Sequence, residues 1–231
     1  MKILLRHFRR FIGYFLSLLI GVLIAIALVS GALYLYVEWS LPNISILNKT
    51  RAVAVRIDQV PKQFIQAVLA TEDSRFYSHP GIDIRGIARA ALAVISSGRK
   101  VQGASTITMQ VARHFFLTPQ KTYLRKINEM LLAIKIENTF SKDKILELYL
   151  NTIYFGNGAH GIVAAARIYY GKKLNRLTLP EMAMLAGIPQ SPAHINPIDN
   201  PEAALIRRNH VLKRMLTLGY IDQATYEKAI T

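Results

Sequence analysis

PKQFIQAVLATEDSRFYSHPGID, residues 61–83, joins an apolar helix to an acidic pair and a turn. Pro61 suits the first position of a helix, and apolar side chains then recur at helical spacing as far as Thr71. The pattern predicts a helix with Glu72 and Asp73 at its carboxyl end, beside a loop. The helix macrodipole disfavours a glutamate at that end, which makes Glu72 a candidate functional residue.

The surroundings of Glu72 act on its carboxyl group in two directions. Burial and the helix dipole would raise its pKa and make it a better base near neutral pH, whereas nearby Arg and Lys would lower that pKa. A surface carboxylate paired with Arg75 is the other interpretation. The sequence leaves both open.

The rest of the chain after this stretch has the periodicity of helices. Thr178 with Glu181 forms a capping box, and Asn200-Pro201 and Asp222 suit the starts of the last two helices. Alternating residues predict one short strand over Ala52–Ile57. The fold is therefore expected to be mainly α, with further helices near 84–96, 106–117, 122–139, 142–151 and 159–170.

The amino-terminal segment has the composition of a membrane anchor. Phe11 to Val37 contains no charged side chain over 27 positions, and about 20 apolar residues cross a bilayer as a helix. Basic residues precede it and Glu38 follows, so the amino terminus is expected in the cytoplasm and the rest outside. A cleaved signal peptide is the alternative, but its apolar core usually spans only about 7 to 15 residues.

We therefore expect four segments in this 231-residue chain. They are a basic cytoplasmic flank (1–10), a single transmembrane helix (11–37), a connector (38–60) and one globular domain (61–231). The protein would lie in the cytoplasmic (inner) membrane, with that domain on the outer or periplasmic face.

The net charge of +15 indicates an anionic partner, whether a nucleic acid, a lipid surface or a phosphorylated substrate. An external location and the lack of any recognisable nucleic-acid motif argue against nucleic acid. The chain has no cysteine, so disulfides and thiolate metal sites are excluded.

Positive charge is concentrated in one part of the sequence. Between Ile84 and Asn128 there are eight Lys or Arg and no Asp or Glu, and Asp83 and Glu129 flank this stretch. Fixed cations stabilise an anionic leaving group while a carboxylate moves a proton. The pattern favours that kind of chemistry.

Lys121, Arg125 and Glu129 are spaced by four residues and would share one ridge of a helix. A solvated face with an ion pair worth about 0.3–0.5 kcal/mol is the plainer interpretation. Arg113 and the absence of acidic residues upstream favour an anion site, because soluble surfaces usually intersperse both signs.

GASTITMQ, residues 103–110, places hydroxyls and an amide after a glycine at an expected helix start. Ser105 or Thr106 would be an ordinary N-cap. The same groups could present neutral donors to a phosphate or sugar, and both interpretations can hold together.

Five stretches resemble, in order and spacing, the motifs of the family 51 peptidoglycan glycosyltransferases. They are TEDSRFYSHPG (71–81), GASTITMQ (103–110), RKINE (125–129), KILELYLN (144–151) and EMAMLAGIPQSPAHINP (181–197). The resemblance covers about residues 58–230. One departure is Met109, where the commoner form of the family has a second glutamine, since a thioether cannot replace an amide donor.

The resemblance implies a lysozyme-like, mainly α-helical domain that polymerises lipid II into β-1,4-linked glycan and releases undecaprenyl pyrophosphate, with inversion at the sugar carbon. Glu72 would be the base that deprotonates the acceptor hydroxyl, and Glu129 would lie near the donor pyrophosphate. By the same resemblance, the substrate-binding residues would be Asp73, Phe76, His79, Ser105, Thr106, Gln110, Arg113, Lys121, Arg125 and Lys126.

Histidine spacing indicates no metal site built by the protein. A divalent cation, Mg²⁺ or Mn²⁺, is compatible with the substrate pyrophosphate. The expected partners are lipid II, the growing glycan strand, membrane lipid and other proteins of cell wall synthesis. Residues 141–144 fit S-x-x-K but lack the companion motifs of a penicillin-binding transpeptidase.

Two rival functions share some of these features. A lysozyme-like hydrolase also uses two carboxylates, but its leaving group is a sugar hydroxyl, which has no use for clustered cations. A non-catalytic anchored scaffold would need none of the motifs. Residues 207–221 resemble the segment that leads out of this domain in class A penicillin-binding proteins, so a fragment of one and a stand-alone transferase both stay open.

Overall fold

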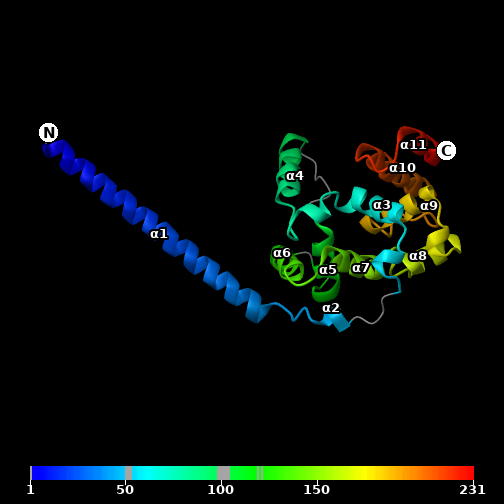
Figure 1. The fold of residues 1–231 in the computed structure, drawn as a ribbon, viewed down its shortest axis with the longest axis horizontal. Coiled ribbons are helices and arrows are strands. Elements are labelled where there is room, and N and C mark those ends of the chain that lie inside the picture. The colour runs from blue at the N-terminus through cyan, green and yellow to red at the C-terminus, as the bar shows by residue number, and fades with distance from the viewer. Residues whose placement is uncertain (1, 50–53, 98–104, 119, 121) are drawn as a thin grey trace. The chain divides into compact units, whose positions relative to one another are not determined.

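The computed structural model describes residues 2–49, 54–97, 105–118, 120 and 122–231. The chain divides into two compact units, Met1–Pro42 and Asn43–Thr231. The described residues form helices and no named strand; the isolated bridge described in this part of the chain pairs Tyr154 with His160. The expected mainly α fold is confirmed (Figure 1).

The first unit is dominated by one long helix, α1 (Lys2–Ser40). Its 29 residues from Ile12 to Ser40 are long and apolar enough to cross a membrane, judged by length and composition within the described residues. The helix begins inside the predicted basic flank and continues past Val37 through Glu38 and Trp39 to Ser40.

The second unit contains ten α-helices and four short 3-10 helices within the described residues. They are α2 (Ile46–Lys49), η1 (Ile57–Gln59), α3 (Lys62–Glu72), η2 (Phe76–Ser78), α4 (Ile84–Ser97), α5 (Ile107–Phe116), α6 (Tyr123–Glu137), α7 (Lys142–Thr152), α8 (Ile162–Tyr170), η3 (Leu174–Arg176), α9 (Leu179–Gly187), η4 (Ile188–Gln190), α10 (Pro201–Thr217) and α11 (Gln223–Ile230).

Six of the α-helices described in this unit begin at a polar side chain that caps the first turn. Thr178 and Glu181 form the predicted capping box of α9. Asn200 caps α10 by accepting from the Ala203 N–H, and Asp222 caps α11 in the same way. Such caps satisfy backbone donors that have no partner within the helix, which is why these predicted starts are confirmed.

Two groups of helices build the domain that carries the site. α9 is buried along most of its length and packs against both α3 and α10, while α5 packs against α6 and α7. Fully buried side chains such as Phe64, Tyr149 and Phe155 fill these layers. In Figure 1 the end of α3 leads toward the α5 group, so the residues after α3 connect the two groups.

The predicted strand over Ala52–Ile57 is wrong in its described part. Residues 54–56 form no strand and Ile57 opens η1, while 52 and 53 lie outside the described residues. Side chains of α7 take the place of a neighbouring strand. Asn151 accepts from the Val55 N–H at 3.1 Å and donates to the Val55 carbonyl at 2.8 Å, and Glu147 accepts from the Ile57 N–H at 3.1 Å.

Candidate active site

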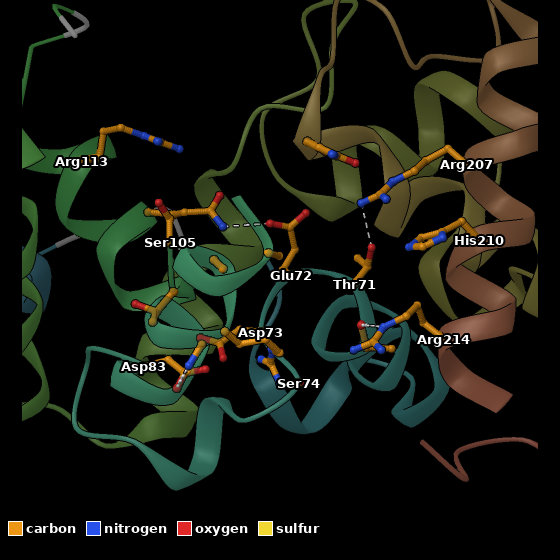
Figure 2. Close-up of a pocket in the computed structure, with 18 residues that line it drawn as sticks. Thr71, Glu72, Asp73, Ser74, Asp83, Ser105, Arg113, Arg207, His210 and Arg214 are labelled. Atoms are coloured by element: carbon orange, nitrogen blue, oxygen red, sulfur yellow. Dashed lines mark hydrogen bonds between the residues drawn. The ribbon is translucent and has the colours of Figure 1, made fainter. Parts of the chain in front are cut away.

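A pocket of about 840 Å³ lies where α3, α4, α5 and α10 meet. Six of the residues predicted from sequence line it, and Figure 2 draws them with their neighbours. These six are Glu72, Asp73, Ser105, Thr106, Gln110 and Arg113. The fold therefore brings together residues from two of the quoted motifs and the cation that follows them.

Glu72 is the last residue of α3, as the helix pattern predicted to within one position. Its Oε2 accepts a hydrogen bond from Gln110 Nε2 at 2.8 Å. Burial raises the pKa of Glu72 above the ordinary value of a glutamate, and the neighbouring Asp73 adds to that rise. The Gln110 hydrogen bond and the charges of Arg207 and Arg113 oppose it without reversing it. The carboxylate is poised to take up a proton.

Basic side chains stand on two sides of this carboxylate. Figure 2 shows Glu72 between Arg113, from α5, and the side chains of Arg207, His210 and Arg214, from α10. The α10 residues are spaced by three and four and so share one helix face. Burial lowers the pKa of His210, and both neighbouring arginines lower it further.

Sequence reasoning missed this α10 wall. The spacing of residues 207, 210 and 214 on one face was a detectable signal, since Val211, Leu212 and Met215 turn into the core. What the sequence could not show is that this face meets a glutamate 135 positions earlier in the chain.

Glu129 does not line the pocket. Its side chain is only 1% exposed and is paired with Arg125 and Lys126, the latter at 2.9 Å. Lys126 Nζ also donates to Ser105 Oγ at 2.6 Å, and Ser105 does line the pocket. The RKINE cluster is thus connected to the pocket wall through one lysine. Lys121 lies outside the described residues.

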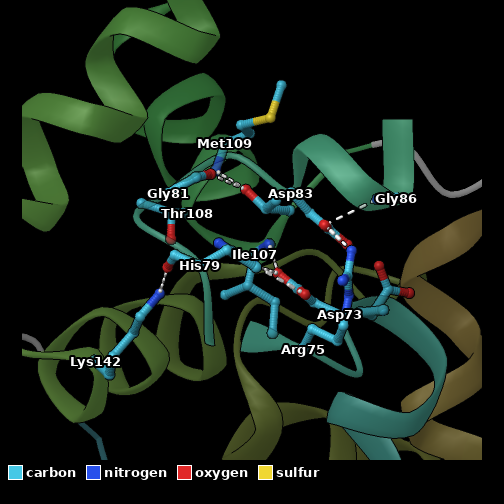
Figure 3. A network of polar contacts seen from close by, with 12 residues as sticks. Asp73, Arg75, His79, Gly81, Asp83, Gly86, Ile107, Thr108, Met109 and Lys142 are labelled. Atoms are coloured by element: carbon cyan, nitrogen blue, oxygen red, sulfur yellow. Dashed lines mark hydrogen bonds and ion pairs between the residues drawn. The ribbon is translucent and has the colours of Figure 1, made fainter. Parts of the chain in front are cut away.

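Asp73 is buried in a network that Figure 3 shows, at the amino end of α5. Both of its carboxylate oxygens lie 3.0 Å from His79 Nε2, and Oδ2 also accepts from the Ile107 N–H at 3.1 Å. Thr106 Oγ1 donates to the Gly81 carbonyl at 2.6 Å. A carboxylate is favoured at a helix amino end, so these contacts fasten the loop after Glu72 to α5.

Phe76 and His79 belong to this loop but do not line the pocket. Phe76 is 1% exposed, and Lys142 Nζ stands 4.4 Å from the centre of its ring. Lys142 also donates to the His79 carbonyl at 2.7 Å and to Glu137 at 2.8 Å. Lys142, one of the two middle residues of the S-x-x-K match, therefore supports the loop. The predicted substrate contacts of Phe76 and His79 stay predictions.

Met109, the departure from the family pattern, turns into the core. It is 1% exposed and does not line the pocket, whereas its neighbour Gln110 binds Glu72. The substitution of a thioether for an amide at this position therefore leaves the polar groups of the pocket in place.

We expect Asp73→Ala to destabilise the domain. The methyl group offers no acceptor, so both His79 Nε2 and the Ile107 N–H lose the partner that Asp73 provides. An unsatisfied buried donor costs about 1–3 kcal/mol. Urea unfolding followed by circular dichroism measures this loss, and unchanged stability would contradict the structural role assigned to Asp73.

Among the described residues, no group of three or more His, Cys, Asp or Glu is placed to hold a metal ion. A divalent cation at the substrate pyrophosphate stays a prediction.

A helical domain whose buried carboxylate stands among cations is the architecture expected of a transglycosylase, and the comparisons agree. Residues 41–216 match the family model described as Transglycosylase. Over 224 residues the chain is 46% identical to "Putative transglycosylase H16_A0665" of Cupriavidus necator, covering 96% of each protein. The chain belongs to the transglycosylase family, the peptidoglycan glycosyltransferases of cell wall synthesis.

Several relatives carry the name Penicillin-binding protein 1A. The one from Escherichia coli is 44% identical over 96% of this chain, and the one from Aquifex aeolicus is 55% identical over 76%. The chain spans only 29% and 24% of those two proteins. A crystal structure of Penicillin-Binding Protein 1A from Haemophilus influenzae aligns with 77% of this chain and 17% of its own, at 28% identity and a TM-score of 0.45.

Proposed function

We propose that this protein polymerises lipid II into β-1,4-linked glycan strands and releases undecaprenyl pyrophosphate. The observation that carries the proposal is the carboxylate of Glu72, which lines a pocket of about 840 Å³ together with Arg113, while Lys126 reaches the wall of that pocket at Ser105. A base and fixed cations in one cavity are what transfer from a pyrophosphate donor requires.

In the proposed reaction Glu72 accepts the proton of the acceptor sugar hydroxyl. The oxygen then forms a bond to the donor sugar carbon as the bond from that carbon to the pyrophosphate breaks. Attack from the face opposite the leaving group inverts the configuration at the carbon. The raised pKa of Glu72 supports this role, because a base is most effective when its pKa approaches the working pH.

The departing pyrophosphate carries the negative charge that develops in the reaction. We place it against Arg113 and the end of the RKINE cluster, where Lys126 reaches the pocket wall at Ser105. Glu129 then acts through Arg125 and Lys126, because its carboxylate is occupied by both. Its contribution is to position the cations and not to move a proton.

The hydrolase alternative is less compatible with this site. A glycosidase of the usual kind needs two carboxyl groups that flank the scissile bond, one as the acid and the other as the base or nucleophile. Glu129, the second predicted carboxylate, is paired with two cations and does not line the pocket. A non-catalytic scaffold would not need the carboxylate of Glu72, whose burial is a cost to stability that its polar partners only partly offset.

We further propose that α1 anchors the protein in the cytoplasmic membrane with the amino terminus inside. Basic residues precede the apolar span and Glu38 follows it, the arrangement that keeps the basic end in the cytoplasm. The catalytic domain would then meet lipid II at the outer face. A polyprenyl tail leaves the bilayer only at high cost, so the substrate remains in the membrane.

Labelled lipid II supplied in detergent to the purified full chain tests the proposal, with products separated by size. The expected result is a ladder of glycan polymers longer than the substrate. Cleavage of a preformed glycan without polymerisation would overturn the proposal in favour of a hydrolase, and no reaction in either assay would favour a scaffold.

The acid limb of the rate should lie at a higher pH than an ordinary glutamate would give. Because burial raises the pKa of Glu72, the group protonates and activity falls while the pH is still above the usual range of a carboxyl group. Initial polymerisation rates across the acidic range measure this midpoint. Gln110→Ala removes a contact that lowers the pKa and should move the midpoint higher still. A midpoint at the ordinary value would contradict the assignment.

A further inference from the structure

Two arginines of α10 contact the carboxyl end of α3, where Glu72 lies. Arg214 Nε donates to the carbonyl of Ala70 at 3.2 Å, and Arg207 Nη2 donates to Thr71 Oγ1 at 2.8 Å. The last carbonyls of a helix have no partner within the helix and carry partial negative charge. The arginines therefore supply both a hydrogen bond and positive charge at the end that would otherwise disfavour a glutamate.

Arg207 is itself held on its other side by the end of α9. Its Nε donates to the carbonyl of Gly187 at 3.4 Å. A Cβ atom added at Gly187 would lie 2.8 Å from Cγ of Arg207, so the arginine stem lies directly against this glycine. A guanidinium that hydrogen-bonds to both α9 and α3 has little freedom to reorient toward a ligand.

We propose that Arg207 and Arg214 are positioning residues, which fix the last turn of α3 and so orient the carboxylate of Glu72 in the pocket. The inference rests on the proposed role of Glu72 as the base. This role differs from substrate binding, because both arginines donate hydrogen bonds to acceptors within the protein.

The charged and titratable groups that act on Glu72 come from the residue after α3 and from three other helices. Asp73 follows it in the chain, Arg113 belongs to α5, Arg207 to α10, and the buried hydroxyl of Tyr149 to α7. Arg207 also contacts the residue before Glu72, because its Nη2 donates to Thr71 Oγ1 at 2.8 Å. Moving Arg207 should therefore change both the orientation and the acidity of Glu72.

Thr71→Val tests the orientation alone. It removes the acceptor of the Arg207 hydrogen bond and keeps every charge in the pocket. We expect kcat for polymerisation to fall roughly 10- to 100-fold, the cost of a misplaced reacting group. KM for lipid II should stay within about twofold, and Thr71→Ser, which keeps the hydroxyl, should retain the rate.

Gly187→Ala tests the same positioning role from outside the pocket, since Gly187 does not line it. The added methyl displaces Arg207, so kcat should fall and the acid limb of the rate should move to higher pH as the cation leaves Glu72. A role confined to folding would not move that limb. Thermal unfolding of each variant verifies that the domain is intact. If Gly187→Ala does not fold, the comparison of Thr71→Val with Thr71→Ser still tests the positioning role.

Three outcomes distinguish a failure of the positioning role from a failure of the proposed function. Unchanged kcat in Thr71→Val, with Glu72→Gln inactive, overturns the positioning role and leaves the proposed function standing. A raised KM with unchanged kcat also overturns it, because Arg207 would then be a substrate ligand. Full polymerisation by Glu72→Gln would overturn the proposed function itself.

Discussion

Glu72→Gln is expected to lower the rate of glycan polymerisation by roughly 10² to 10⁴, the usual contribution of a positioned general base. The amide has nearly the same shape and can still accept the hydrogen bond of Gln110, so the pocket should keep its form. The loss would therefore come from the missing proton acceptor. Product ladders from labelled lipid II measure it.

The same substitution should raise the melting temperature at neutral pH. The folded-state pKa of Glu72 is above its unfolded value, so the folded protein binds the proton more tightly. Its stability then decreases as pH rises from the unfolded pKa through the folded one, and at neutral pH the ionised side chain is a net cost. The neutral amide removes that cost.

Asp58→Asn is a matched control for the first prediction. Asp58 also carries a carboxylate, but it is 62% exposed and pairs with Arg56 on the surface. Exposed pairs contribute little, so rate and melting temperature should both stay unchanged. Loss of activity in this variant, or a lower melting temperature in Glu72→Gln, would count against the account of the site.

Arg125→Ala should both destabilise the domain and weaken use of the donor. Glu129 is 1% exposed and Arg125 is one of its two partners. Removing one partner of a buried ion pair costs about 3–5 kcal/mol, because the remaining charge is left without full compensation. Urea unfolding gives the loss of stability, and KM for lipid II reports the weakened donor contact.

A double variant tests where that loss originates. Arg125→Met with Glu129→Leu removes both charges of the pair, so it should unfold at a higher urea concentration than Arg125→Ala alone. Lys126→Ala should be milder for stability, since Lys126 is 40% exposed. Wild-type stability in Arg125→Ala would show that the pair contributes little.

Local signals in the sequence were sufficient for most helix positions. Capping residues such as Asn200 and Asp222 fix where a helix starts, and the start is confirmed where such a cap exists. The helix expected from residue 159 instead begins at Ile162. Gly161 there has a φ of +78°, and a Cβ atom would lie 2.5 Å from the Asn151 carbonyl, so a close approach to α7 delays the helix.

The site was less accessible to sequence reasoning than the helices. The i, i+4 spacing of Arg125 and Glu129 predicted that they share a ridge, and the structure pairs them. The spacing could not reveal that Glu129 is buried, nor that α10 brings Arg207 to Thr71. Both depend on contacts between distant segments, which a single sequence does not record.

The side chains of Asn151 and Glu147 hydrogen-bond the backbone of residues 55–57, and these contacts determine where the domain can be truncated. A truncated protein that begins at Pro61, the predicted domain boundary, would lose these three hydrogen bonds and expose one side of α7 to solvent. That helix also carries Tyr149, whose buried hydroxyl interacts with Glu72. A shortened enzyme that keeps its pocket has to begin upstream of Val55.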